Sequence, residues 1–288
     1  MRGVPGRAMA IALAAAAVCW PAAPAGAQST APGAPGASAN WTTGNKQGLG
    51  TSVGTDSKVW YTLSDGALSE VYYPSGDRAN VRSLEFAVTD GSTFVDRESQ
   101  DTLHTVRLVD QRSLTYEQVN TAKSGRYRIT KTYVTDPARS TTLVRVTFEP
   151  LIAGSYRLFA LFDPALANSS RHDTATRSGD ALLAQDGSVA SALVAAPGFA
   201  RTSNGFVGTS DGWTDLASDK TLDFDYDTAP DGNVLQTGEI ALDGATTFAL
   251  ALGFGDSTAA ATDATGLGPK HAKAARDKMG RHLVVVAT

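Results

Sequence analysis

Apolar and polar residues alternate with a period of two along one short segment after another, from Trp41 to about Asp256. In the segment 126–134, Tyr127, Ile129 and Tyr133 fall on one face, while arginine and threonine residues occupy the other. Such alternation, rich in Val, Thr, Tyr and Phe, is typical of half-buried antiparallel strands. The same pattern predicts further strands at 58–64, 68–73, 142–148, 155–162, 182–185, 189–195, 222–226, 234–242 and 246–254.

Asp-Gly pairs separate many of these segments, and they stand at 65–66, 90–91, 186–187, 211–212, 231–232 and 243–244. Asp-Gly between two β-prone runs is a strong hairpin signal because Gly accepts the positive φ of a tight turn. The clearest case is KVWYTLSDGALSEVYYP, residues 58–74. No long amphipathic helix separates the strands, which favours hairpins over parallel βαβ units. The sequence therefore predicts an all-β fold of two large packed antiparallel sheets.

The pattern predicts one convincing helix, Pro269–Met279, because Pro starts a helix well and the Lys and Ala residues after it favour continuation. Gly280 ends this helix, and the short apolar run 283–286 follows. We interpret that run either as a last strand or as the product of an interrupted reading frame, and we favour the second interpretation.

The first 27 residues have the pattern of a secretory signal peptide. Arg2 and Arg7 precede the apolar run 8–20, and Ala25-Gly26-Ala27 fits the small-x-small cleavage site. We therefore expect a secreted protein, followed after cleavage by a flexible leader at 28–40 that is rich in Ala, Pro, Gly and Ser. The chain has a single cysteine, in the predicted signal peptide, so the exported protein is expected to rely on a large core rather than on disulfides.

The charge of the chain limits its partners. Its formal net charge is −4, and removal of the two arginines of the signal peptide makes it −6. The charges are scattered without a basic run, so we expect neither nucleic acid nor an anionic membrane as a partner.

Several separated phrases resemble the N-terminal domain of bacterial glucodextranases and glucoamylases, glycoside hydrolase family 15. They are WTTGNKQGLGT at 41–51, KVWYTLSDGALSEVYYP at 58–74, NVRSLEFAVTDG at 80–91, GFVGTSDGWTDL at 205–216 and GNVLQTGEIAL at 232–242. The resemblance implies an antiparallel two-sheet supersandwich at 41–268. It also implies that 269–288 begins the linker helix towards a helical barrel, followed here by an atypical tail.

In that family the barrel hydrolyses α-glucosidic bonds with inversion, and its glutamates act as acid and base. The resemblance assigns no catalytic residue here, because those barrel positions have no counterpart in the chain. An inverting glycosidase needs two carboxyl groups about 6.5–9.5 Å apart with different protonation. Glutamate occurs only at positions 70, 85, 98, 117, 149 and 239. We interpret Glu70, Glu85 and Glu149 as side chains of solvated strand faces.

Asp211, Trp213 and Asp215 in SDGWTDL form the best candidate for carbohydrate or partner binding. A sugar ring presents an apolar face and a rim of hydroxyl groups, which suit an aromatic ring and carboxylates. Packing of the Trp213 loop within the domain or onto a barrel is the alternative, and we favour it.

Two further groups carry weaker chemical signals. Asp223, Asp225 and Asp227 alternate along a predicted strand and would suit calcium, although they fail the EF-hand spacing, and a solvated edge strand is the favoured interpretation. No other cofactor or metal is expected. A mutarotase-like enzyme would require His104 and His172 to meet in one pocket, and no local motif predicts this.

The favoured function is therefore a secreted β-domain that scaffolds a catalytic barrel absent from this chain. The first alternative is a stand-alone module that binds an α-glucan, and the second is a sugar mutarotase.

Overall fold

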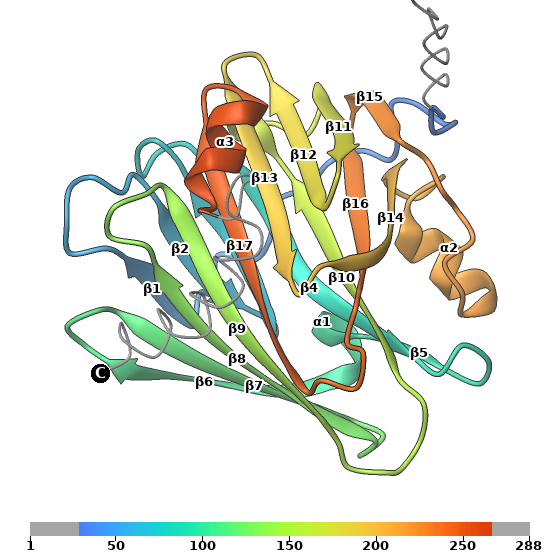
Figure 1. Ribbon diagram of the computed structural model, residues 1–288. Coiled ribbons are helices and arrows are strands. Elements are labelled where there is room, and N and C mark those ends of the chain that lie inside the picture. Colours follow the sequence, from blue (N-terminus) through green and yellow to red (C-terminus); the bar gives the residue numbers. More distant parts are fainter. Residues whose placement is uncertain (1–28, 267–288) are drawn as a thin grey trace, which may run out of the picture.

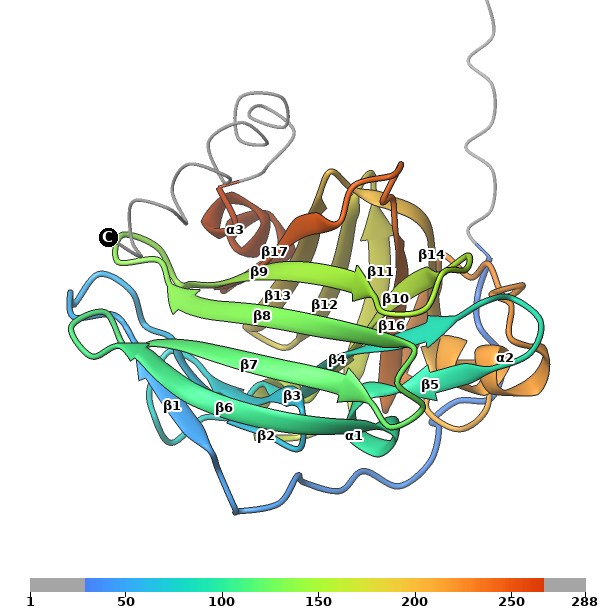
Figure 2. The same cartoon turned by 90° about the horizontal axis from the view of Figure 1, so that it is seen from below.

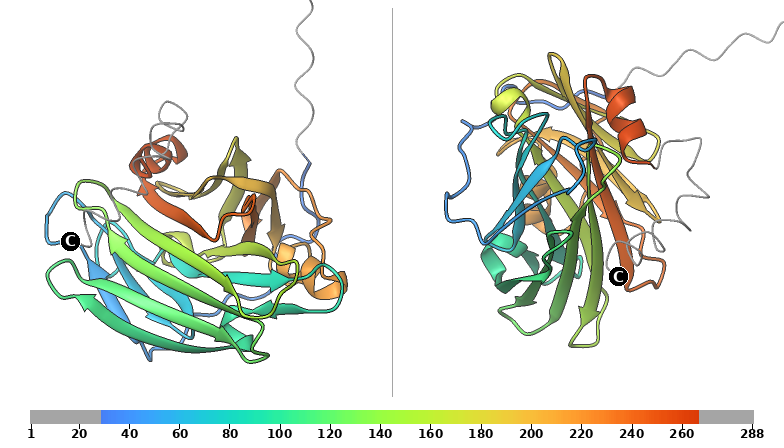
Figure 3. Two further views of the ribbon diagram at one scale, coloured as in Figure 1. Left: turned by 60° about the horizontal axis from the view of Figure 1, so that its bottom comes forward. Right: turned by 90° about the vertical axis from the view of Figure 1, so that its left-hand side faces the viewer.

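The computed structural model describes residues 29–266, which form two antiparallel sheets packed face to face. Figure 3 shows the two sheets side by side in its right-hand view. This arrangement confirms the predicted all-β, two-sheet architecture.

The first sheet has eight strands. In spatial order they are β1 (Gly48–Thr51), β2 (Trp60–Ser64), β3 (Ala67–Tyr72), β4 (Val81–Thr89), β10 (Arg157–Pro164), β16 (Val234–Ile240) and β14 (Phe199–Phe206), with β5 (Val95–Arg97) paired to β4.

The second sheet has nine strands. Their order is β15 (Thr228–Gly232), β11 (Asp173–Ser178), β12 (Ala181–Asp186), β13 (Val189–Ala196), β17 (Thr247–Gly255), β9 (Thr141–Pro150), β8 (Tyr127–Thr135), β7 (Thr115–Ala122) and β6 (Thr102–Asp110).

The hairpin predicted from Asp65-Gly66 is present between β2 and β3. Asp65 has φ 50° and Gly66 has φ 74°, the pair of positive values that a type I′ turn requires. Ser64 lies opposite Ala67, so the two strands pair directly from the turn onwards.

The main core lies between the two sheets, and the alternation along β8 shows how it is built. Tyr127, Ile129 and Tyr133 are buried among residues of the first sheet such as Phe86, as their shared face predicts. The outer faces of both sheets carry smaller apolar clusters.

Two helices cover those outer clusters (Figure 1). α2 (Gly212–Asp219) packs Leu216 against the first sheet, and α3 (Thr258–Ala264) packs Ala261 against β13 and β17 of the second. The remaining helical turns are α1 (Glu98–Asp101) and the 3₁₀ turn η1 (Leu166–Asn168). The helix predicted at 269–279 lies outside the described residues. Within 29–266, no helix is both long and apolar enough to cross a membrane.

An ion pair is buried in the core where the two sheets meet. The Nζ of Lys131 on β8 lies 2.9 Å from Oε2 of Glu98 and donates to the carbonyl oxygen of Gly66 at 2.7 Å. The carboxylate of Glu98 also accepts the N–H of Phe86 at 2.7 Å and the side-chain amide of Asn120 at 2.6 Å. These contacts join the β2–β3 turn, α1 and β4 to the second sheet.

The segment 29–40 is not the loose leader that its composition predicts. Thr30 forms a parallel bridge with Thr228 of the edge strand β15, and Ala31 beside it is buried. Figure 2 shows the segment passing α2 and running towards β1. Small side chains leave the backbone groups free to pair, so the exposed edge of a sheet can hold a segment that has no periodicity of its own.

Candidate functional site

A cavity of about 530 Å³ opens on the outer face of the first sheet, and we call it the outer pocket. Side chains of β4 and β10 contribute Ser83, Glu85 and Asp163. The segment before β1 and the first turn of α2, with Trp213, also line it. Residues far apart in the sequence therefore meet in this pocket.

Both arginines of the outer pocket are already paired with carboxylates. The guanidinium of Arg97 lies 2.7 Å from Oε1 of Glu85, and Nη1 of Arg82 lies 3.4 Å from Oδ2 of Asp163. Glu85 and Asp163 are each only 3% exposed. Six ionisable side chains line the pocket, and these four of them form two ion pairs.

Asp163 has a strongly perturbed protonation equilibrium. Burial raises the pKa of its carboxyl group to about 7, and the nearby cations Arg82 and Arg97 oppose this shift. Below that pH the Asp163 carboxyl is mainly neutral, so it both donates and accepts hydrogen bonds.

Asp211, the first predicted binding residue, is the N-cap of α2. Its Oδ1 accepts the N–H groups of Trp213 at 2.9 Å and Thr214 at 3.0 Å, and its Oδ2 accepts the N–H of Gly208 at 2.6 Å. The Asp211-Gly212 pair therefore starts a helix and is not the hairpin turn that the sequence predicts. Asp211 lines the outer pocket, but both of its oxygens hold the backbone.

Trp213 is half-buried, and it lies in the first turn of α2 rather than in a loop. The ring packs against the apolar cluster beneath α2, and the guanidinium of Arg97 lies 5.2 Å from the ring centroid. The same side chain also lines the outer pocket. Trp213 therefore packs against the first sheet and also borders the outer pocket.

Asp215, the third predicted residue, does not line the outer pocket. Its Oδ2 accepts the N–H groups of Asp223 and Phe224, both at 2.6 Å. Burial raises the pKa of Asp215, and these two hydrogen bonds oppose the shift. Its carboxylate fixes the chain that follows α2.

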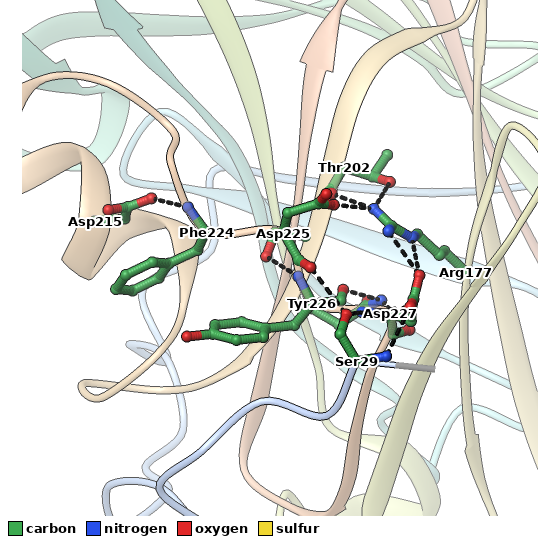
Figure 4. A network of polar contacts seen from close by, with 10 residues as sticks. Ser29, Arg177, Thr202, Asp215, Phe224, Asp225, Tyr226 and Asp227 are labelled. Atoms are coloured by element: carbon green, nitrogen blue, oxygen red, sulfur yellow. Dashed lines mark hydrogen bonds and ion pairs between the residues drawn. The ribbon is translucent and has the colours of Figure 1, made fainter. Parts of the chain in front are cut away.

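The three aspartates considered for calcium lie in that same segment, which is not the strand predicted at 222–226. Asp225 and Asp227 each form an ion pair with Arg177 at 2.6 Å, and Asp227 also accepts the N–H of Ser29 (Figure 4). Through these contacts the two carboxylates bind Arg177 and the N-terminal segment. Within 29–266, no group of three His, Cys, Asp or Glu side chains is placed to hold a metal ion.

The two histidines of the mutarotase hypothesis are not brought together. His104 lies on β6, at one edge of the second sheet, while His172 directly precedes β11, next to the opposite edge. Seven strand steps of about 4.8 Å separate these strands. His172 instead pairs with Asp231 through Nδ1 at 2.8 Å.

The solvated interpretation of the strand glutamates holds for Glu149, whose side chain is 54% exposed. It fails for Glu85, which is 3% exposed and pairs with Arg97, and for Glu70, which is 13% exposed and pairs with Lys46 at 3.0 Å. Sequence reasoning missed Glu85 and Asp163 as pocket residues. The available signal was a lone carboxylate next to an apolar strand run, LEFAV for Glu85 and LFALFD for Asp163.

A second buried acid, Asp173, leads to a prediction of pH-dependent stability. Burial raises the pKa of Asp173 to about 8, and the N–H of Leu166, which donates to Oδ1 at 3.2 Å, opposes this shift. Between about pH 4 and pH 8 the unfolded chain has lost this proton while the folded chain keeps it, so stability falls as the pH rises. Asp173→Asn should remove a slope of up to about 1.4 kcal/mol per pH unit.

Urea unfolding at several pH values between these limits measures that slope. Asp56→Asn, at an exposed position, is the control and should follow the wild type. Parallel profiles for Asp173→Asn and the wild type would contradict the prediction.

A two-sheet antiparallel sandwich with a polar pocket on one outer face defines an all-β domain of the supersandwich type. The family model for domain N of glucodextranase matches residues 31–276. The chain therefore belongs to the glucodextranase N-domain family, as the sequence resemblance predicts.

Two glucoamylases are similar to the chain. A glucoamylase of Clostridium sp. (strain G0005) is 38% identical over 229 residues, which cover 77% of this chain and 32% of the glucoamylase. The crystal structure of a bacterial glucoamylase complexed with acarbose matches with a TM-score of 0.80 and 34% identity, covering 88% of this chain and 39% of that one. The match thus spans between about a third and two fifths of the length of these relatives.

Proposed function

We propose that this chain is the exported N-domain of a glycoside hydrolase of family 15, in which it supports a helical catalytic domain that hydrolyses an α-glucan. The observation that carries the proposal is that 77% and 88% of this chain match only 32% and 39% of two glucoamylases. The signal-peptide pattern of residues 1–27 supports export.

The surface of the second sheet is consistent with a supporting role. Its edge strand β6 exposes Leu103, Leu108 and Val109, with Leu103 at 67% exposure. Unpaired edges with exposed apolar side chains are usually covered by another element. A catalytic domain packed nearby would cover them.

A domain exchange tests this proposal. Residues 29–266 replace the aligned part of the Clostridium glucoamylase, and the matched control is the same enzyme with that part deleted. We expect the exchanged enzyme to be soluble and to release glucose from soluble starch, whereas the deletion loses solubility or activity. The isolated chain should release no glucose.

The proposal fails if the exchanged enzyme behaves like the deletion. It also fails if the isolated chain releases glucose and Asp163→Asn abolishes that release, because the activity would then belong to this chain's own carboxyl group.

A further inference from the structure

Three buried polar atoms that have no hydrogen-bond partner among residues 29–266 belong to residues that line the outer pocket. They are Oγ of Ser83, Oδ1 of Asp163 and Oδ1 of Asn233. Their residues are 5%, 3% and 5% exposed. Buried polar atoms are nearly always paired, and each unpaired one costs about 1–3 kcal/mol. Three of them around one cavity indicate that the cavity takes a polar ligand.

The charges of the pocket exclude an ionic ligand as the best fit. An anion would need an unpaired cation, but Arg97 is paired with Glu85 and Arg82 with Asp163. A cation would need several unpaired carboxylates, but Glu85 and Asp163 are held by the same two arginines and both oxygens of Asp211 accept backbone N–H groups. Among the lining carboxyl groups this leaves the exposed Asp65. The unpaired atoms belong to a hydroxyl, a carboxyl and an amide group, which match ligand hydroxyl groups because these donate as well as accept.

Trp213 gives the pocket the apolar surface that a sugar ring needs. The ring is half-buried at the pocket wall and is held by Arg97, whose guanidinium lies 5.2 Å from the centroid. The volume of about 530 Å³ lies within the range of about 300–1,000 Å³ that is usual for small-ligand pockets. It therefore has room for a short saccharide.

We propose that the outer pocket is a saccharide-binding site in which Trp213 stacks on a sugar ring while Ser83, Asp163 and Asn233 hydrogen-bond its hydroxyl groups. We choose a short α-glucan as the ligand class because of the proposed function. The argument for the binding geometry does not depend on that function. The site belongs to this domain alone and needs no catalytic partner.

A peptide segment from a neighbouring domain is the competing occupant. Such a segment needs apolar anchor pockets or a free strand edge. The outer pocket lies on the face of the sheet, and hydroxyl, amide and charged side chains dominate its lining. The observations therefore favour the saccharide.

Calorimetric titration of the full chain with maltotriose and, separately, isomaltotriose tests the site at about pH 6, below the pKa of Asp163. We expect millimolar or tighter binding of one of them. Ser83→Ala should weaken it about tenfold, the loss of roughly one hydrogen bond. Trp213→Ala should weaken it further, because the stacking surface is removed.

Ser191→Ala is the matched control. Oγ of Ser191 is likewise buried without a partner in the described chain, but it lies on β13, away from the outer pocket. Both serine variants should fold at least as stably as the wild type, since each removes an unpaired hydroxyl group. Only Ser83→Ala should change the affinity.

Two results would overturn the site. One is that neither trisaccharide gives a heat signal. That result would also be seen if Trp213 packs against a catalytic domain and not against a sugar. The other is binding that Ser83→Ala and Trp213→Ala leave unchanged. An active exchanged enzyme that binds no trisaccharide through this domain would refute the pocket while leaving the proposed function intact.

Discussion

Replacing Lys131 with methionine is expected to lower the free energy of unfolding by about 3–5 kcal/mol, because it leaves a carboxylate buried without its cation. Glu98 is fully buried, and Lys131 is its one cationic partner in an ion pair among the described residues, at 2.9 Å. Burial raises the pKa of Glu98 and lowers that of Lys131, and their pairing opposes both shifts. Urea unfolding followed by circular dichroism measures the loss.

Lys58→Met removes a lysine from an exposed position and should change the stability by less than about 0.5 kcal/mol. The double variant Glu98→Gln/Lys131→Met should lose less stability than the sum of its single variants, because each single variant leaves one buried charge without its partner and the double variant leaves none. Additive losses would show that the two side chains are not coupled, contrary to the geometry.

The second large effect is expected at Gly205, where alanine should cost about 3 kcal/mol through overpacking. A Cβ at Gly205 on β14 would overlap the carbonyl group of Ser210 and lie 2.5 Å from the Cα of Asp211. The overlapped atoms belong to the backbone and cannot rotate away. The turn before α2 would have to move, and the Asp211 cap and Trp213 would move with it.

Gly44→Ala is the matched control, because a Cβ there meets no atom within 4 Å and its backbone needs no positive φ. Its unfolding midpoint in urea should equal that of the wild type within error. If Gly205→Ala also unfolds at the wild-type midpoint, the close approach of β14 to the Ser210 turn is wrong.

The sheets could be predicted from the sequence because their signals are local. Period-two alternation places Tyr127, Ile129 and Tyr133 in the core, and Asp65-Gly66 turns the chain between β2 and β3. Lys131 falls on the same face as these three residues, and the pattern alone does not show that Glu98 neutralises it there.

Predictions failed where contacts that leave no alternation pattern in the sequence decide the structure. The side chain of Asp211 caps a helix instead of opening a hairpin turn, and the choice depends on the Gly208 and Trp213 N–H groups that it reaches. The segment 29–40 has no periodicity, yet it finds backbone partners at Thr228 and Val207. Composition describes neither kind of contact.

The candidate site was predicted in part. Trp213 and Asp211 line the outer pocket and Asp215 does not, while Asp211 and Asp215 use their oxygens on the backbone. Ser83, Asp163 and Asn233 carry no motif, and they meet only because β4 and β10 are neighbours and residue 233 precedes β16. No residue spacing along the chain predicts that these three side chains lie close together.

The course of the N-terminal segment matters for anyone who produces this domain recombinantly. A start at Trp41, the boundary that composition suggests, would strip the bridge at Thr228 and leave strand β15 open to pairing between molecules. It would also remove Ala37 and Asn40, which line the outer pocket. The expressed chain should therefore begin no later than Ser29. An affinity tag should be added before Ser29 and should not replace the segment 29–40.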